Sequence, residues 1–317
     1  MTIRERQERD EEARLSPYAA LSSRSAGRAH PISTCDLRTC YQRDRDRIIH
    51  CKSFRRLKYK TQVFLTPMGD HYRTRLTHTL EVSQVARTLA RSLRLNEDLT
   101  EAAALGHDLG HTPFGHIGES TLNRLLPGGF RHNEQSLRVA ERLENDGQGL
   151  NLCRETLDGI LNHSGQNEPK TLEGWCVRRA DRIAYINHDI DDAIRGGILK
   201  PFELPRRCLS VLGETHGERI DTMIRDIVTT SMDQPFVRMS EEVRQASEEL
   251  RAFLFEYVYH DEWRKKEEAR CDYILSALYE HYLAHPEQLP AEYLEINFTE
   301  GAERAVCDFI ACMTDRY

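Results

Sequence analysis

The sequence contains no pair of cysteines spaced as C-x-x-C, although it has nine cysteines among its 317 residues. Zinc-ribbon sites are built from such pairs, so the sequence argues against that class of metal site. The number of cysteines is odd, and free thiols are typical of a reducing compartment. We therefore expect the protein in the cytoplasm, with its thiols unpaired.

Long hydrophobic runs are also missing. No apolar stretch approaches the roughly 18 residues that a membrane-spanning helix requires, and the charged N-terminus lacks the apolar segment of a signal peptide. With 39% hydrophobic and 30% charged residues, the composition is typical of a soluble globular protein, so we expect no membrane partner. The net charge of -7 argues against binding of nucleic acid through overall charge.

Strand-like alternation is weak, no glycine-rich phosphate loop is present, and most segments have helical periodicity. We therefore expect an all-α fold, with an irregular N-terminal arm over residues 1–38 and a single domain over residues 39–317. Thr77 is the expected cap of the second helix. The predicted helices are 40–57, 77–95, 99–109, 116–126, 133–144, 172–195, 218–232, 240–259, 261–285 and 298–314.

Polar residues follow an alanine-rich, helix-forming stretch that ends at residue 105. His107 and Asp108 stand at the end of this predicted helix, where buried polar groups need partners. With His78 and Asp181 they make two imidazoles and two carboxylates, which can hold one divalent cation and leave positions for water and a phosphate oxygen. Taken singly, each residue is more often a packed or capping side chain. As a set, they point to metal-assisted hydrolysis of a phosphate ester.

His116 and Glu119 lie three residues apart in a predicted helix, so their side chains share a face. A carboxylate beside an imidazole raises the imidazole pKa and fixes its tautomer, as a general acid or base requires. We interpret the pair as catalytic. The alternative is a capping or salt-linked pair without a chemical role.

Four further residues are candidates for substrate contacts. Arg75 lies one turn before the first candidate metal ligand and suits a phosphate. His132 stands at a helix start, where the helix dipole favours an anion, although Asn133 as an N-cap is an alternative explanation of this segment. Tyr185 and Asp189 follow the last candidate ligand by four and eight residues, on the helix face where a sugar could bind.

Eight Lys and Arg residues crowd the segment 43–60, just before the metal motif. One interpretation is a solvated helix face on which Asp44 and Asp46 balance part of the charge. The alternative is a wall of cations that meets phosphates in the active site, or that forms an interface or a regulatory nucleotide site.

Five segments together resemble a known family. They are FRRLK at 54–58, KTQVF at 60–64, GDHYRTRLTHT at 69–79, GHDLGHTPFGH at 106–116 and MTDRY at 313–317. The chain resembles bacterial deoxyguanosinetriphosphate triphosphohydrolase-like proteins, which are HD-domain dNTPases. The resemblance implies an HD-domain helical bundle with additional C-terminal helices and a metal-binding core near residues 71–195. It also implies hydrolysis of a dNTP to a deoxynucleoside and inorganic triphosphate.

The resemblance implies roles for individual residues. One divalent ion per active site, Mn²⁺ or Mg²⁺ with iron, nickel, cobalt or zinc as alternatives, is implied to bind His78, His107, Asp108 and Asp181. The implied catalytic residues are His116, Glu119 and His111. The implied substrate contacts are Arg75, Gln62, His132, Arg182, Tyr185 and Asp189, with Gln62 near the 3′-hydroxyl.

The chain departs from the family pattern at two places. Arg182 stands where the family often has Glu, and Cys312 stands where it tends to have Gly. A distant human relative with SAM and HD domains has a Lys at the first position, which faces phosphates. We therefore expect Arg182 to contact phosphates as well.

The likeness further implies a homo-oligomer and an activating dNTP at a second site. One alternative function is an HD phosphohydrolase of nucleoside monophosphates or cyclic nucleotides, and the arginines near the metal set argue against it. The other is a nucleotide-sensing or single-strand-binding protein with weak catalysis. The complete ligand set, accompanied by His116 and Glu119, argues against that alternative.

Overall fold

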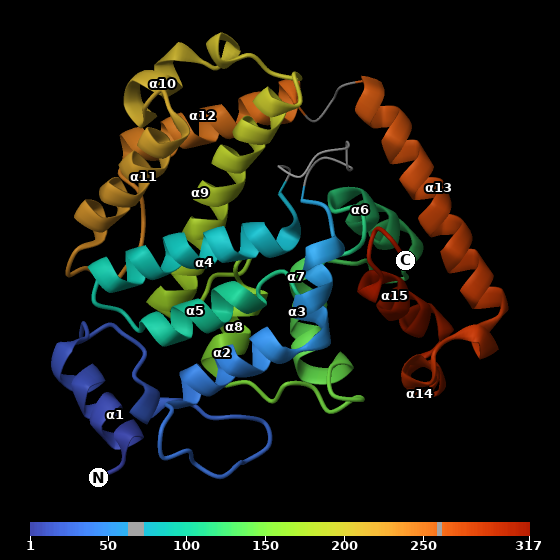
Figure 1. The fold of residues 1–317 in the computed structure, drawn as a ribbon, viewed down its shortest axis with the longest axis horizontal. Coiled ribbons are helices and arrows are strands. Elements are labelled where there is room, and N and C mark those ends of the chain that lie inside the picture. Colours follow the sequence, from blue (N-terminus) through green and yellow to red (C-terminus); the bar gives the residue numbers. More distant parts are fainter. Residues whose placement is uncertain (63–72, 259–261) are drawn as a thin grey trace.

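The fold is built from helices (Figure 1). The computed structural model describes residues 1–62, 73–258 and 262–317, without the side chains of residues 262–265. Within these ranges the only strand-like pairs are two isolated bridges, so the predicted all-α fold is confirmed. Part of the family-like motif, residues 63–72, lies outside the described residues. The α-helices are α1 Ile3–Arg14, α2 Cys40–His50, α3 Lys52–Arg56, α4 Arg75–Ser92, α5 Glu97–Gly106, α6 His116–Leu125, α7 His132–Arg138, α8 Arg154–Leu161, α9 Leu172–Arg195, α10 Arg206–Leu212, α11 His216–Ser231, α12 Glu241–Tyr257, α13 Glu262–Ala284, α14 Ala291–Glu300 and α15 Ala302–Cys312.

Helix α9 is the central element, because α4, α5, α8, α11 and α12 all pack against it. Figure 1 shows it running through the middle of the molecule, next to α4 and α5. Thr171 caps its start by accepting the N–H of Gly174 (3.1 Å), and the helix ends at Arg195 before two glycines, as predicted. Most of its residues are buried, so a side chain on α9 has a fixed place relative to five other helices.

Small residues allow α5 to approach its neighbours closely. A Cβ built on Gly106 would lie 2.5 Å from a methyl of Ile160, and one built on Gly159 of α8 would lie 2.8 Å from the Cβ of Ala103. The alanine-rich sequence of α5 therefore does more than favour a helix. It lets α5 pack closely between α2, α4, α8 and α9, so that His107, the C-cap residue of α5, is buried.

The C-terminal helices form a second hydrophobic cluster, in which α6, α13, α14 and α15 pack together. These helices lie on one side of the molecule in Figure 1, with α13 at the edge. Asp308 of α15 is fully buried and accepts hydrogen bonds from Arg138 (2.8 Å) and from Gln135 (2.8 Å) of the α7 region. Buried polar bonds thus join this cluster to the part of the chain that carries the metal motif.

The prediction of an irregular N-terminal arm was wrong for residues 3–14, which form α1. Thr2 accepts the N–H of Glu5 (3.2 Å), and the Glu5 carboxylate accepts the N–H of Thr2 (2.8 Å), a reciprocal cap. Arg4 and Glu8 form an ion pair one turn apart (2.6 Å). Local capping and charge pairing therefore support a helix that has no fully buried residue.

Several predicted helices begin or end differently in the structure, among them 298–314, which is divided at Gly301 between α14 and α15, and two others show the cause. Residues 40–57 form α2 and α3 with a break at Cys51, whose extended backbone lets its Sγ accept the N–H of Phe54 (3.3 Å). The cap of α4 is Thr74 and not Thr77, because Thr77 is the partner residue of the capping box. The short helices α8, α10 and α14 were not predicted from their periodicity.

The basic segment 43–60 is largely used inside the fold. Arg45 pairs with Asp98 (3.5 Å) and Glu101 (3.3 Å) of α5, and Arg47 donates to the carbonyl groups of residues 150 and 151. These bonds tie α2 to its neighbours. A role of the segment as an interface or a regulatory site stays a prediction.

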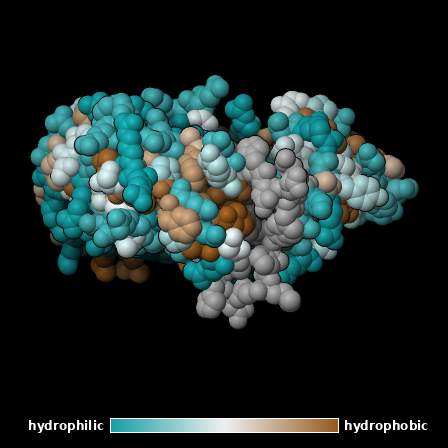
Figure 2. Space-filling model, turned by 90° about the horizontal axis from the view of Figure 1, so that it is seen from above, coloured by the Kyte–Doolittle hydropathy of each residue, from teal (hydrophilic) through white to brown (hydrophobic). Residues whose placement is uncertain are grey.

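None of the described helices is long and apolar enough to cross a membrane. Figure 2 shows one face of the molecule, on which hydrophilic residues predominate and hydrophobic residues gather toward the middle.

Candidate active site

Four candidate metal ligands from three helices converge. His78 lies in the first turn of α4, His107 and Asp108 at the end of α5, and Asp181 in the middle of α9. The His78 Nε2 is 3.1 Å from a carboxylate oxygen of Asp181, and the His107 Nε2 is 3.9 Å from the same oxygen. The His107 Nε2 is also 3.6 Å from Asp108 Oδ2. The structure therefore brings together the residues that the sequence predicts as one set.

The local backbone orients His107 as a ligand. Its Nδ1 lies 2.7 Å from the carbonyl oxygen of Ala104 in the last turn of α5, which assigns the proton of the neutral ring to Nδ1. The Nε2 then carries a lone pair. Within the described part of the chain this nitrogen is buried and has no hydrogen-bond partner, which in a native site calls for an unseen ligand.

The two carboxylates are held in the ionised form. Burial opposes the charge of Asp108, but His107 and Arg75 lower its pKa well below the ordinary value. Burial likewise opposes the charge of Asp181, and the hydrogen bond with His78, followed by the charge of His107, lowers its pKa. Two anionic carboxylates beside an imidazole nitrogen without a partner fit a divalent cation.

A second polar chain lies beside the metal set and centres on Glu119. One Glu119 oxygen is 2.8 Å from Nδ1 of His132 and accepts the backbone N–H of that residue (2.9 Å). The other oxygen is 3.4 Å from Nδ1 of His116. Burial raises the pKa of Glu119, but the hydrogen bonds with the two histidines lower it far more, so the carboxylate is anionic. The predicted pair is thus part of a hydrogen-bonded series of three residues, His116, Glu119 and His132, which we call the Glu119 chain.

The same chain extends to His163, which sequence reasoning missed. The Nε2 of His163 is 3.1 Å from Nε2 of His132, and its Nδ1 is 2.7 Å from the carbonyl oxygen of Ile160. Burial, followed by the charges of His107 and His132, lowers the pKa of His163 to about 3. Its sequence signal is the run His163-Ser164 after α8, a short helix that the sequence analysis did not predict.

Two histidines that line the neighbouring cavity, His111 and His132, have pKa values shifted in opposite directions. Burial lowers the pKa of His132, but the bond to Glu119 outweighs it and raises the pKa above the ordinary value. Burial and the charge of Arg75 lower the pKa of His111 well below its ordinary value. The rings of His111 and His132 stack with centroids 4.9 Å apart. Two imidazoles whose pKa values are shifted in opposite directions therefore lie side by side.

These groups open into a cavity of about 450 Å³. Of the predicted contacts, Gln62, Arg75, His132, Tyr185 and Asp189 line it, together with His111 and His116. Two residues of α12 that were not predicted, Arg251 and Phe255, also line it, as does Glu268 of α13. The sequence could not show these contacts, because α12 and α13 follow the metal motif by more than sixty residues and reach the site only through tertiary packing.

Two arginines that were predicted to contact phosphates, Arg75 and Arg182, are placed differently from a simple phosphate contact. Arg75 donates from Nη1 to Asp108 (2.6 Å) and from Nη2 to the carbonyl of Gln62 (3.4 Å), so it also positions a candidate ligand. Arg182 does not line this cavity but a neighbouring one between α9 and α12. The predicted contact of Arg182 with substrate phosphates stays a prediction.

Comparison with known proteins identifies the class. A model of the HD domain matches residues 75–186, which include all four candidate ligands. A model of the phosphohydrolase-associated domain matches residues 237–317. With the all-α fold and the convergent His and Asp residues, these matches define an HD-domain protein of the phosphohydrolase type, and HD domains bind divalent metal ions.

Relatives narrow the class to one family. A "deoxyguanosinetriphosphate triphosphohydrolase-like protein" of Caldanaerobacter subterraneus subsp. tengcongensis is 59% identical over 317 residues, 100% of this chain and 94% of the relative. A protein of the same name from Clostridium perfringens strain 13 is 52% identical over 326 residues, 100% of this chain and 95% of the relative. The chain belongs to the family of deoxyguanosinetriphosphate triphosphohydrolase-like proteins.

A crystal structure of a hypothetical protein from Aquifex aeolicus also aligns with the chain. It is 21% identical with a TM-score of 0.44, and the alignment covers 83% of this chain and 66% of that one.

Proposed function

We propose that the protein is a metal-dependent triphosphohydrolase that converts a dNTP and water to a deoxynucleoside and inorganic triphosphate. The observation that carries this proposal is one cavity that is lined both by residues of the metal set, His78, Asp108 and Asp181, and by the histidines bonded to Glu119. The relatives' name supports the same substrate class. A divalent ion bound by His78, His107, Asp108 and Asp181 supplies Lewis acidity toward phosphate oxygens, and Mn²⁺ or Mg²⁺ is our first choice.

The cavity walls suit the two halves of such a substrate. Arg75 and Arg251 offer positive charge to a triphosphate, and His132, whose pKa is raised by its bond to Glu119, offers a further polar contact. Tyr185 and Phe255 offer aromatic surface to the nucleoside. A site for a monophosphate would need fewer cations, which favours the triphosphate over the alternative substrates.

His116 is our candidate for the residue that moves the proton. The reaction forms a bond from water oxygen to the α-phosphorus and breaks the bond from this phosphorus to the 5′ oxygen, which leaves with a proton. His116 lines the cavity with an exposed ring, and Nδ1 faces the Glu119 carboxylate at 3.4 Å. The carboxylate orients the ring, so that a proton carried by Nε2 can be donated to the leaving oxygen.

A product assay tests the proposal. Purified protein with Mn²⁺ or Mg²⁺ is given each dNTP singly and then all four together, and nucleoside and triphosphate are separated by chromatography. We expect equal amounts of deoxynucleoside and triphosphate. Turnover only in the mixture indicates an activating nucleotide. Cleavage of nucleoside monophosphates without release of triphosphate would overturn the proposal.

His116→Ala tests the assigned role. We expect kcat to fall by roughly 10² to 10⁴ while metal content is unchanged, because general acid catalysis contributes about that factor. His281→Ala, an exposed histidine of α13 that is bonded to Gln288 (2.9 Å), is the matched control and should leave kcat unchanged. Near wild-type turnover of His116→Ala would remove His116 from the mechanism.

A further inference from the structure

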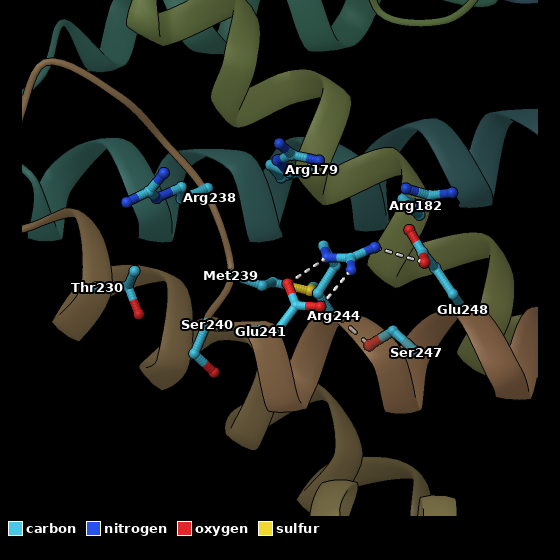
Figure 3. Close-up of a pocket in the computed structure, with 10 residues that line it drawn as sticks. All are labelled: Arg179, Arg182, Thr230, Arg238, Met239, Ser240, Glu241, Arg244, Ser247 and Glu248. Atoms are coloured by element: carbon cyan, nitrogen blue, oxygen red, sulfur yellow. Dashed lines mark hydrogen bonds and ion pairs between the residues drawn. The ribbon is translucent and has the colours of Figure 1, made fainter.

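The active-site cavity and the cavity beside it offer different ligand atoms. The cavity between α9 and α12 (Figure 3) is lined by arginines, glutamates and uncharged side chains, and none of its described lining residues is a histidine. The active-site cavity is lined by histidines both at the metal set and at the Glu119 chain. The histidines beyond the metal set have a ligand geometry of their own.

Three side chains form a second group of potential metal ligands. One ligand atom each of Asp108, His132 and His163 lies within 4.8 Å of the other two. Asp108 makes a similar group with His78 and His107 of the metal set. The two groups therefore share one carboxylate. They also lie side by side, because the ring centroids of His107 and His163 are 4.9 Å apart.

Hydrogen bonds direct a nitrogen lone pair of His163 toward His132. The Nδ1 of His163 donates to the carbonyl oxygen of Ile160 (2.7 Å), so the lone pair of the neutral ring is on Nε2. The Nδ1 of His132 faces Glu119 (2.8 Å), so a neutral His132 ring also carries its lone pair on Nε2. A carboxylate and a backbone carbonyl are the usual outer partners of metal-bound histidines.

The distance between these two nitrogens fits two ligands of one ion. The Nε2 atoms of His132 and His163 are 3.1 Å apart, and Ser164 Oγ is 3.3 Å from the first of them. Metal–nitrogen bonds of about 2.1 Å separate two ligands by roughly 3.0 Å at a right angle and by about 3.4 Å at a tetrahedral angle. Two lone pairs at this distance repel unless a cation lies between them. That cation is either a proton on His132 or a metal ion.

The third ligand and the open cavity favour the metal ion. A proton joins two acceptors only, whereas the carboxylate of Asp108 converges on the same two nitrogens. This carboxylate accepts a hydrogen bond from Arg75 (2.6 Å), but its two oxygens have about four lone-pair positions and can also bind metal. Asp108, His132 and His163 all line the cavity, so water or a phosphate oxygen can complete the coordination.

We propose that Asp108, His132 and His163 bind a second divalent cation beside the ion of the metal set, with Asp108 shared between the two ions. Two imidazoles and one carboxylate suit a transition ion such as Mn²⁺ or Fe²⁺ better than Mg²⁺, which prefers oxygen ligands. The second site has one carboxylate and the metal set has two, so the second ion should need a higher metal concentration. The proposal deepens the proposed function, because it adds a cation to the same cavity.

Equilibrium dialysis against Mn²⁺, followed by metal analysis, counts the sites. We expect two ions per wild-type chain at saturation. His163→Phe keeps a ring but offers no ligand atom, and it should bind one ion, with the affinity of the tighter site unchanged. His163→Ala should also bind one ion, and retention of the tighter ion shows that the variant is folded.

His188→Phe is the matched control. The His188 ring is also buried and lies against a candidate ligand, with its centroid 5.8 Å from that of His78, but it does not belong to the proposed site. This variant should bind two ions. Two Mn²⁺ ions that share a carboxylate couple magnetically, so low-temperature EPR should show a coupled pair in the wild type and in His188→Phe. The spectrum of His163→Phe should be that of an isolated ion.

The outcomes separate this proposal from the proposed function. One ion per wild-type chain at saturation, or two ions in His163→Phe, would overturn the second site. Loss of both ions from both His163 variants would assign His163 to the metal set and would overturn it as well. A single ion together with release of triphosphate would leave the proposed function intact. Two ions without release of triphosphate from any dNTP would support the second site and contradict the proposed function.

Discussion

Around the candidate site, the hydrogen-bond partners of single buried side chains determine which atoms remain available and which groups stay ionised. His107 keeps one nitrogen for a ligand because the other is bonded to Ala104. Glu119 stays ionised although it is largely buried, because it is bonded to two histidines. Lys60 is fully buried and donates to the carbonyl groups of His111 and Ala311 (2.8 Å to the latter). Each of these buried groups has a polar partner that offsets the cost of its burial.

Asp181→Asn should remove most metal binding. The amide keeps the size of the side chain but loses the negative charge that the cation needs. We expect metal affinity to fall at least tenfold, about 1.4 kcal/mol, with little loss of the helical fold. Metal analysis after dialysis and calorimetric titration with Mn²⁺ check this. Asp221→Asn, on the exposed side of α11, is the control. Unchanged affinity of Asp181→Asn would exclude the residue as a ligand.

The burial of Lys60 predicts that the free energy of unfolding depends on pH. Burial lowers its pKa from 10.5 to about 8. Between these values the unfolded chain binds more protons than the folded chain, so the contribution of Lys60 to the free energy of unfolding rises with pH. From pH 7 to 9.5 the gain is about 2 kcal/mol. It is checked by urea unfolding of wild type and Lys60→Met at both pH values.

The difference in unfolding free energy between wild type and Lys60→Met should therefore change with pH. Lys58→Met, a change at an exposed lysine two residues away, should show no such change in its difference from wild type. A pH-independent difference for Lys60→Met would mean that the buried amine keeps its ordinary pKa.

At the scale of elements, glycines decide how closely the helices and turns of the motif meet. A Cβ on Gly110 would lie 2.2 Å from backbone atoms of Gln135 and Ser136 in α7, and the N–H of Gly110 donates to the Ser136 hydroxyl (2.9 Å). The turn after Asp108 thus rests directly on α7, the helix that begins with His132. The metal set and the Glu119 chain are joined by this contact.

Gly110→Ala should separate the turn from α7. Backbone atoms cannot give way as a flexible side chain can, so we expect a loss of roughly 1–3 kcal/mol in unfolding free energy. We also expect a lower kcat, because His132 moves with α7. Gly217→Ala is the control, since that helical glycine in α11 has nothing within 4 Å of a built Cβ. It should be neutral or stabilising by up to about 1 kcal/mol. Equal stability of the two variants would contradict the close contact.

At the scale of the whole molecule, the metal set joins helices that are distant in the sequence. Its candidate ligands come from α4, the end of α5 and α9, and residues of α12 and α13 line the same cavity. A ligand that binds only the folded arrangement stabilises the fold by mass action. Metal binding should therefore be visible as global stability and not only as activity.

Removal of the metal should lower the melting temperature. At a metal concentration of about 100 Kd the expected stabilisation is about 2.7 kcal/mol, which for a chain of this size corresponds to roughly 5 °C. Scanning calorimetry with EDTA and with added Mn²⁺ measures this difference. Asp181→Asn should melt at one temperature under both conditions. A wild-type melting temperature that does not respond to Mn²⁺ would contradict a site built from three helices.

The sequence by itself determined the fold class, the boundaries of α9 and the residue types of the metal set. Helical periodicity and capping are local properties, and the run around His107 and Asp108 is too polar for the end of a buried helix without a partner. The missed helix α1 is also local, but its capping box and ion pair carry no hydrophobic period.

Only the tertiary structure decided which distant residues meet. His163 joins the Glu119 chain, Arg251 reaches the active-site cavity, and Arg182 lines the neighbouring one. These placements depend on the packing of α8 and α12 against α9 and its neighbours, which involves residues far apart in the chain. Spacing along one helix fixes the face of a side chain. The cavity that this face meets is fixed by the helices packed against it.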